Sequence, residues 1–476
     1  MDFIYGLAVF LVIFEGIIIQ CEGMGASSSN QGQDISTNDI RGDQQIFPNE
    51  LVELILSKSD FETIRKIIRS QKQRITDIIM SKILQDHIIL IDRHEEFDVT
   101  DIREYHVQGD SFLRICNYTR LVQFFDRFGY KVKKIQISYS SSSSKVPHKQ
   151  INQNIVKRWA KNLQELRFGI EGDWGFWEEI SDGDNYSIFP EVKWFQNMGR
   201  STQNKFELNL IFPKLESLKV YGPVADANCL ANVKGLKELL LVSSSIEEHK
   251  LDDIFANNEN LTKIYLSMLN RRETMGSIAK YLTKLETLGV EFPGRNFMLR
   301  ANNNEVCKLP SVEHFEIKFI QMGEVFAIGN LSFVMPNLKK LTLNGHQTNG
   351  HLIDFINFFK KLEILELFVK EHITVGCIEE LQHIKEITTT FYKNDFDSLK
   401  KMFERFDEKS KLQTLKFAYF RDSLYEFYEG EMEKINLQLK NSEKPTWTLS
   451  YEERFGTHRI DLIFRRKPCA CKSGKK

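Results

Sequence analysis

A short pattern of apolar positions returns through most of the chain: an apolar residue, two variable residues, an apolar residue, a variable residue and an apolar residue. Clear copies begin at Leu215, Leu236, Leu261, Leu285, Val312, Leu338, Leu362 and Leu412, and a copy at Ile384 has only its first two apolar residues. Eight steps separate Leu215 from Leu412, so the mean period is about 25 residues. Because side chains alternate along a strand, the last three positions of each copy predict a strand with one buried face.

Weaker copies begin upstream, at Leu163 and at Val132. Stretches compatible with helices lie between the expected strands, at residues 252–258, 278–282, 352–359 and 398–405. Stacked repeats of this kind place a parallel sheet on the concave side and helices on the convex side, with a continuous core between them. We therefore expect an α/β solenoid. A doubly wound fold would have longer repeats and a phosphate-binding glycine cluster, which the sequence lacks.

This pattern resembles that of the leucine-rich-repeat family over roughly residues 130 to 420. The Asn or Cys that the family places a few residues after each strand is missing, so we expect irregular repeats. The resemblance implies that the concave face binds a target protein. The exposed strand positions expected to contact this target are Tyr221, Tyr265, Ser267, Glu316, Lys318, Thr342, Asn344, Glu366, Phe368 and Lys416.

Upstream of the array, residues 46–90 carry three short amphipathic patterns. After an apolar opening, Ser59 and Glu62 form a capping box for a second helix, whose apolar face begins at Ile64. A third helical pattern begins at Ile75. Three helices of this length cannot bury their faces well alone, so we expect at least one face to meet a partner.

The opening of this segment resembles an F-box, which begins with a hydrophobic-Pro pair, a Glu-Leu pair and an Ile or Leu one turn later. The Val-Cys-x-x-Trp ending of that family is replaced by residues 70–74. The resemblance implies binding to a Skp-type adaptor protein of a cullin ubiquitin ligase. The residues that would hold the adaptor are Phe47, Pro48, Glu50, Leu51, Leu54, Ile55, Leu56, Phe61 and Ile64. The alternative is a helical cap that seals the first repeat.

The beginning of the chain indicates export. Residues 3–19 are apolar apart from Glu15 and two glycines, and small and polar residues follow from Cys21 to Ala26. This is typical of a cleaved signal peptide. No later stretch reaches the roughly 20 apolar residues of a spanning helix, so we expect no stable membrane insertion after cleavage. The polar residues that follow, up to residue 45, predict a flexible linker.

Composition narrows the function classes. The chain has 64 Lys and Arg against 65 Asp and Glu, which argues against a nucleic-acid partner bound through bulk positive charge. The sequence contains no Gly-x-Ser-x-Gly, His-Glu-x-x-His or paired Cys-x-x-Cys motif, so we expect no enzyme, no catalytic residue, no metal and no cofactor. Cys229, Cys307 and Cys377 hold nearly the same phase of the repeat, which favours small buried side chains over disulfides.

These features divide the chain into segments. We predict a signal peptide at 1–23, a flexible linker at 24–45, an F-box-like helical module at 46–90, a connecting region at 91–130, leucine-rich repeats at 131–420, and a C-terminal cap and basic tail at 421–476. Within the cap, residues 447–451 and 460–464 predict a strand pair that covers the open end of the core.

The layout resembles the secreted F-box/leucine-rich-repeat effectors of gall-midge saliva. The resemblance implies a secreted virulence protein, delivered into the cytoplasm of host cells, that joins the adaptor to an unknown target protein. One alternative is an extracellular leucine-rich-repeat recognition or adhesion protein, for which Arg41-Gly42-Asp43 is a candidate adhesion tripeptide and the N-terminal helices are only a cap. Another is a cytosolic F-box protein whose first residues form a buried helix.

Overall fold

The chain divides into two units, Met1–Ile55 and Leu56–Lys476, and all residues that the computed structural model describes belong to the second. Apart from a few single positions, these are residues 80–92, 102–107, 110–115, 118–138, 158–169, 189–197, 207–222, 227–242, 246–267, 273–292, 307–319, 333–345, 352–369, 380–390, 411–420, 447–454 and 459–466, with scattered positions between 430 and 439. The predicted signal peptide, the linker and the adaptor-binding residues from Phe47 to Ile64 lie outside them.

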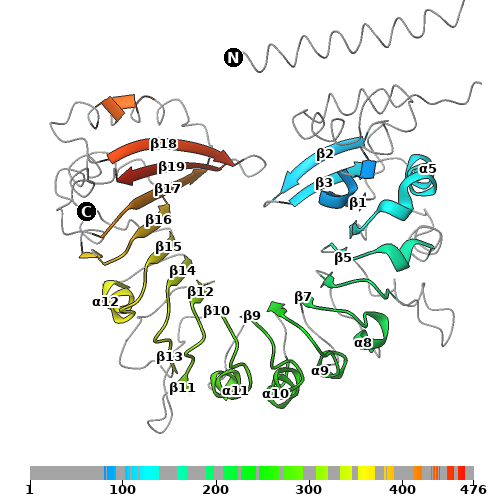
Figure 1. The fold of residues 1–476 in the computed structure, drawn as a ribbon, viewed down its shortest axis with the longest axis horizontal. Coiled ribbons are helices and arrows are strands. Elements are labelled where there is room, and N and C mark those ends of the chain that lie inside the picture. Colours follow the sequence, from blue (N-terminus) through cyan, green and yellow to red (C-terminus); the bar gives the residue numbers. More distant parts are fainter. Residues whose placement is uncertain are drawn as a thin grey trace, which may run out of the picture. The chain divides into compact units, whose positions relative to one another are not determined.

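The described residues form one sheet of 17 strands and a separate pair of two-residue strands. From β4 to β17 each strand of the sheet pairs in parallel with the next, and Figure 1 shows them following one another along a curved sheet. These strands are β4 (Lys134–Ser138), β5 (Glu165–Phe168), β6 (Trp194–Asn197), β7 (Ser217–Tyr221), β8 (Glu238–Val242), β9 (Lys263–Ser267), β10 (Thr287–Phe292), β12 (His314–Phe319), β14 (Lys340–Gly345), β15 (Ile364–Val369), β16 (Glu386–Thr390) and β17 (Thr414–Phe420). The predicted α/β class is confirmed, and the arrangement is consistent with a solenoid.

Each strand forms where the apolar pattern predicts it, because the pattern supplies one fully buried face. From Leu218 to Leu415 the central apolar residue of every clear copy is at most 1% exposed. The register places these residues directly beside one another, as Leu239 lies between Leu218 and Ile264. The apolar positions therefore form continuous buried rows, which hold successive repeats together.

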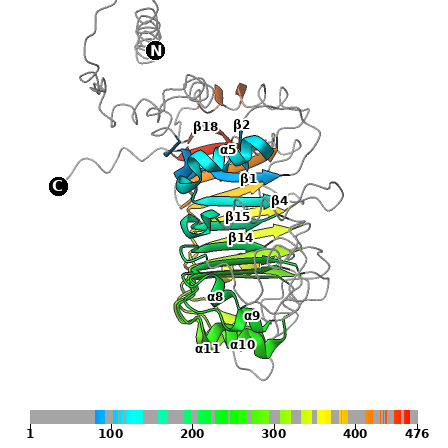
Figure 2. The same cartoon turned by 90° about the vertical axis from the view of Figure 1, so that its right-hand side faces the viewer.

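Helices and short turns connect the strands on the outer side of the sheet, against its buried apolar face. Figure 1 shows them along the outer side of the curved sheet, and Figure 2 shows the strands stacked one beside the next. They are α8 (Leu208–Ile211), α9 (Asn228–Ala231), α10 (Glu248–Ala256), α11 (Glu273–Tyr281) and α12 (Leu352–Phe358), with 3-10 turns at Gly129–Lys131 and Ala160–Asn162 and the small strands β11 (Cys307–Lys308) and β13 (Phe333–Val334). Three predicted helical stretches thus correspond to α10, α11 and α12, whereas residues 398–405 lie outside the described residues.

The N-terminal end of the sheet differs from the prediction. Strand β1 (Ile88–Asp92) pairs in parallel with both β4 and β3 (Asp110–Ile115), and β3 pairs antiparallel with β2 (Ile102–Val107). Residues 88–90, expected in the helical module, are therefore strand, and much of the expected connecting region belongs to the sheet or to α5 (Tyr118–Phe128). The reason is the apolar run at Ile88, Ile89 and Ile91, whose side chains the sheet buries.

The C-terminal end forms the predicted strand pair. Strands β18 (Trp447–Arg454) and β19 (Arg459–Arg466) are antiparallel, and β19 also pairs antiparallel with β17. Phe464 is buried and its ring contacts that of Phe417, with ring centroids 5.9 Å apart. The strand pair therefore covers Phe417 of β17, the last parallel strand of the array, at the place predicted for a cap.

Two devices support the turns of the repeats. Phe195 stacks on Phe212 at 4.7 Å between ring centroids, and Phe212 also contacts Phe189, which builds an aromatic column in the N-terminal repeats. Further along, the fully buried Asn258 accepts a hydrogen bond from the Leu236 backbone N–H and donates to two backbone carbonyls. A single buried amide thus satisfies backbone groups in the turns that precede β8 and β9.

Candidate functional site

The inner face of the sheet, opposite the helices, carries three rows of side chains. The first row precedes the central buried residue of each strand, the second follows it, and the third lies two residues further on. In β9, for example, these are Lys263, Tyr265 and Ser267 around the buried Ile264. The parallel register places equivalent residues of neighbouring strands side by side, so each row is continuous across the array.

All ten predicted target-contacting residues lie on this inner face. The second row contains Tyr265, Glu316, Thr342, Glu366 and Lys416, and the third contains Tyr221, Ser267, Lys318, Asn344 and Phe368. Asn344 is exposed and seven others are half-buried, but Ser267 and Thr342 are only 6% exposed. The expectation of exposure is therefore wrong for these two, because their short side chains lie among longer neighbours.

An aromatic and cationic cluster lies on β5, β6 and β7. The Arg167 guanidinium carbon is 4.5 Å from the centroid of the Trp194 ring, and the Lys219 ammonium is 4.9 Å from it. Arg167 also forms ion pairs with Glu165 and with Asp110 of β3. The indole is thus held between two cations of neighbouring strands, which fixes its orientation on the inner face.

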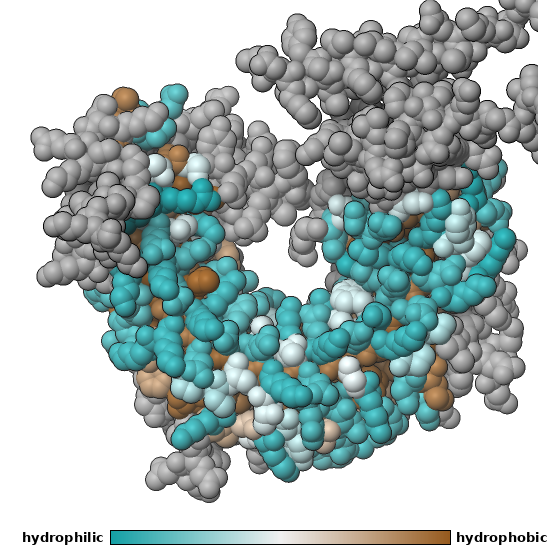
Figure 3. All heavy atoms as spheres, in the orientation of Figure 1, coloured by the Kyte–Doolittle hydropathy of each residue, from teal (hydrophilic) through white to brown (hydrophobic). Residues whose placement is uncertain are grey.

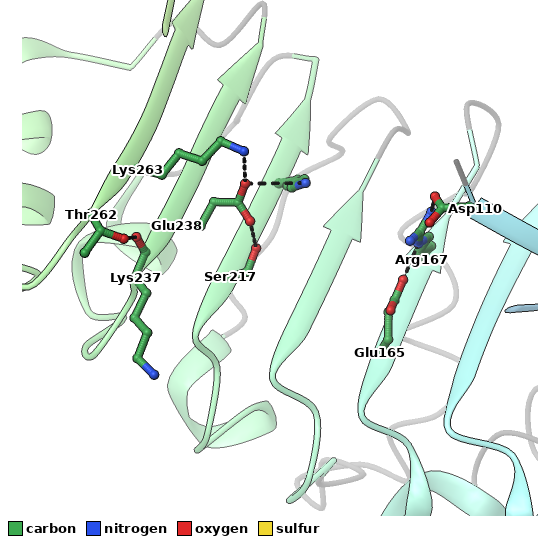
Figure 4. Close-up of polar contacts among 9 residues, drawn as sticks. Asp110, Glu165, Arg167, Ser217, Lys237, Glu238, Thr262 and Lys263 are labelled. Atoms are coloured by element: carbon green, nitrogen blue, oxygen red, sulfur yellow. Dashed lines mark hydrogen bonds and ion pairs between the residues drawn. The ribbon is translucent and has the colours of Figure 1, made fainter. Parts of the chain in front are cut away.

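Glu238 joins this cluster to the centre of the face. Its carboxylate accepts a hydrogen bond from the Ser217 hydroxyl at 2.7 Å and pairs with Lys263 at 2.9 Å, as Figure 4 shows. It also pairs with Lys219 at 3.6 Å. Burial raises the pKa of Glu238, but the hydrogen bonds from Lys263 and Ser217 outweigh it and hold the pKa below its usual range. The carboxylate therefore stays ionised at neutral pH.

Tyr265 and Gly289 meet on neighbouring strands. A β-carbon at Gly289 would lie 2.9 Å from Tyr265 Cε2 and closer still to Cδ2, so the ring lies over the glycine. Burial raises the pKa of Tyr265, and Glu291 and Glu316 raise it further. Burial likewise raises the pKa of Glu316. The phenol and two carboxyl groups therefore share one confined region of the face.

Glu291 is the most deeply buried charge of this region. Its carboxylate pairs with Lys318 at 2.6 Å through one oxygen, and the other oxygen has no hydrogen-bond partner. Its side chain is 4% exposed, whereas that of Lys318 is 45% exposed. The ammonium therefore lies on the solvent side of the carboxylate.

A further hydrogen-bonded chain crosses β12, β14 and β15. Thr342 donates to a Glu366 carboxylate oxygen at 2.9 Å, and His314 Nε2 lies 3.1 Å from the same hydroxyl oxygen. Because the single hydroxyl proton goes to Glu366, His314 must donate through Nε2. Burial lowers the pKa of His314 to about 4, and the nearby Lys340 lowers it as well. His314 is therefore neutral at physiological pH.

Four half-buried side chains with apolar character lie side by side among these charges. In the register Tyr221 is beside Val242, and Leu240 is beside Tyr265. We call Tyr221, Leu240, Val242 and Tyr265 the central patch. Figure 3 shows that hydrophilic residues cover most of the described part of the side of the array turned to the viewer. An apolar centre within a polar surround is the composition of protein-binding surfaces.

Sequence reasoning missed the first row, and it named no residue of this face before Tyr221 although it predicted the strands that follow Val132 and Leu163. The first row includes Trp194, Glu238, Lys263 and His314. The signal was present, because the second variable residue of each copy lies two residues before the third variable residue, which was assigned to the inner face, and so points to the same face. The strand of Trp194 escaped notice because Asn197 stands where the pattern requires its third apolar residue.

The described residues show neither a metal site nor a membrane span. They bring together no group of His, Cys, Asp and Glu side chains that could hold a metal ion. In the part of the chain that the structure describes, every helix is too short or too polar to cross a membrane. No protein-family model matches the chain, and no curated protein matches it.

Proposed function

We propose that this protein is a leucine-rich-repeat recognition protein that binds a target polypeptide on the inner face of its sheet. The observation that supports this most directly is the continuous three-row surface, in which aromatic and apolar side chains form a centre and charged side chains surround it. Such a surface offers area and hydrogen-bonding groups to a partner.

We further propose that the target is bridged to a Skp-type adaptor of a host cullin ubiquitin ligase, and that the protein is a secreted effector. The basis is the F-box-like segment beginning at Phe47 and the apolar run at residues 3–19. A substrate receptor needs two separate binding surfaces on one chain, and the segment and the inner face would supply them. The adaptor surface and the target surface can then be tested independently.

The test is capture of the purified chain, residues 24–476, by immobilised purified Skp-type adaptor. The double variant Phe47→Ala, Leu51→Ala should lose capture, because it removes two large apolar contacts of the expected adaptor surface. The control is Leu240→Ala with Val242→Ala, which changes only the inner face and should be captured like the unmodified chain.

Capture that survives the Phe47 and Leu51 changes would remove the adaptor assignment. Absence of capture for the unmodified chain would remove it as well. Either result would leave the alternative, an extracellular recognition protein whose N-terminal helices serve only as a cap.

A further inference from the structure

Two exposed lysine side chains, Lys263 and Lys318, lie on the inner face near the central patch. Lys263, in the first row of β9, is 51% exposed, and Lys318, in the third row of β12, is 45% exposed. Tyr265 lies between these two positions, on β9 and over Gly289 of β10. A partner that covers the patch and extends across β10 to β12 would therefore meet both ammonium groups.

The carboxylates that pair with these lysines are placed differently. Glu238, the partner of Lys263, is 21% exposed, and Glu291, the partner of Lys318, is 4% exposed. The lysines thus lie on the solvent side and the carboxylates beneath them. Although the chain is almost neutral as a whole, an approaching partner meets positive charge around the central patch first.

Glu316 is a half-buried carboxyl group among these lysines. It lies close enough to Tyr265, Lys263, Lys318 and Lys340 to interact with them electrostatically, and burial raises its pKa above the usual range. Lys340 pairs with Glu366, which also lies near Glu316. The more exposed lysines of this region, Lys263 and Lys318, therefore remain the charges that face a partner first.

We propose that the central patch binds an acidic segment of a partner polypeptide, in which a large apolar side chain is flanked by Asp or Glu. The apolar side chain would pack on Leu240, Val242 and Tyr265, and the flanking carboxylates would pair with Lys263 and Lys318. This inference rests on the proposed recognition function and specifies the chemistry of its target. Complementary charge at the rim sets partner choice and orientation, while the apolar centre supplies most of the binding free energy.

The probe is a set of three pools of short fluorescein-labelled peptides with a central Leu, Phe or Tyr. The pools differ only in the flanking residues, which are Asp and Glu, Ser and Gln, or Lys and Arg. Binding to the full mature chain is followed by fluorescence anisotropy at low and at physiological salt. We expect the acidic pool to bind most tightly, the basic pool most weakly, and the difference to shrink as salt is added.

Two variants and a control locate the binding. Lys263→Gln with Lys318→Gln removes both ammonium groups, and Glu291→Gln is added because its carboxylate would otherwise remain buried without its partner. Leu240→Ala with Val242→Ala removes apolar contact area. The control is Lys237→Gln with Lys339→Gln, two exposed lysines that pair with Glu216 and Glu313; Figure 4 shows Lys237 pointing away from Lys263.

The charge variant should weaken the acidic pool by about tenfold or more and leave the neutral pool nearly unchanged. The control removes more positive charge from the chain and should bind like the unmodified protein. Equal binding of the three pools, tighter binding of the basic pool, or unchanged acidic-pool binding by the charge variant would overturn the proposal. So would a lack of binding by every pool.

The apolar variant separates this inference from the proposed function. If Leu240→Ala with Val242→Ala weakens all pools equally and the acidic pool has no advantage, the face recognises peptides but the proposed charge chemistry is wrong. If peptides bind and this variant changes nothing, the inner face is not the binding surface, and the recognition function assigned to it fails together with the inference.

Discussion

At the scale of single residues, the inner face is held in one protonation pattern by its own hydrogen bonds. His314 donates to Thr342, which donates to Glu366, and Glu366 also pairs with Lys340 at 2.9 Å. Burial raises the pKa of Glu366, but the contacts with Lys340 and Thr342 outweigh it and lower the pKa overall. A neutral histidine and an ionised glutamate therefore lie on either side of one hydroxyl group.

This arrangement predicts a pH dependence of stability. The pKa of His314 is about 4 in the folded state against an ordinary 6.5, so between these values the unfolded chain binds more protons and the free energy of unfolding falls as pH falls. His314→Gln should reduce that fall. Urea unfolding midpoints at pH 7.5 and pH 5, for both proteins, give the comparison; an equal drop in both would contradict the assignment.

A second prediction concerns the contact between Tyr265 and Gly289. Gly289→Ala should displace the ring and lower the free energy of unfolding by about 1–3 kcal/mol, because a β-carbon there collides with it. The matched control is Gly276→Ala in helix α11, where a β-carbon meets no atom within 4 Å and should stabilise the helix by up to about 1 kcal/mol. Chemical denaturation of both variants measures the opposite signs.

At the scale of elements, the buried amide of Asn258 ties together the turns of two successive repeats. Asn258→Leu should lower the free energy of unfolding by about 2–4 kcal/mol, since the Leu236 N–H and two carbonyls lose their partner inside the core. Asn257→Ala removes a hydrogen bond to Ala231 O from an exposed side chain and should cost about 1 kcal/mol or less. Equal losses, measured by urea unfolding, would show that burial of Asn258 is unimportant.

Much of the element order followed from sequence because one apolar period recurs with few interruptions. The exceptions have local causes. Asn197 and Thr389 are buried although polar, so the copy before β6 was overlooked and the copy at Ile384 looked incomplete. The strand at Ile88–Asp92 lies on a continuous apolar run, which does not distinguish a strand from a helix.

The inner face was harder to predict than the strands. Periodicity identified the positions that share the inner face, and all ten expected residues lie on it. It does not reveal which of these side chains are covered by side chains of adjacent strands. Thr342 is buried because His314 and Glu366 hold its hydroxyl from adjacent strands. Likewise, Lys318 lies outside Glu291, although the sequence presents the two as equal charges. Which side chain covers another depends on contacts between strands that are far apart in the chain.

At the scale of the described sheet, stability depends on covering its last strand. Ending the chain before β18 would remove β19 as well, and would expose the backbone edge of β17 and the ring of Phe417. We expect this shortened chain to associate, because an uncovered edge strand with apolar neighbours pairs with other chains. Light scattering after size-exclusion chromatography measures it, and ending the chain after Arg466 is the control. A monomeric shortened chain would contradict the capping role.

The antiparallel strands at the two ends of the described sheet also restrict how this array could change in length over evolution. β2 runs against β3 at one end, and β19 runs against β17 at the other, while the strands from β3 to β17 pair in parallel with one another. A duplicated repeat would find a parallel partner only if it were inserted inside the array. Repeat number could therefore grow from the middle, which would lengthen the inner face and move its two ends apart while leaving both terminal strands intact.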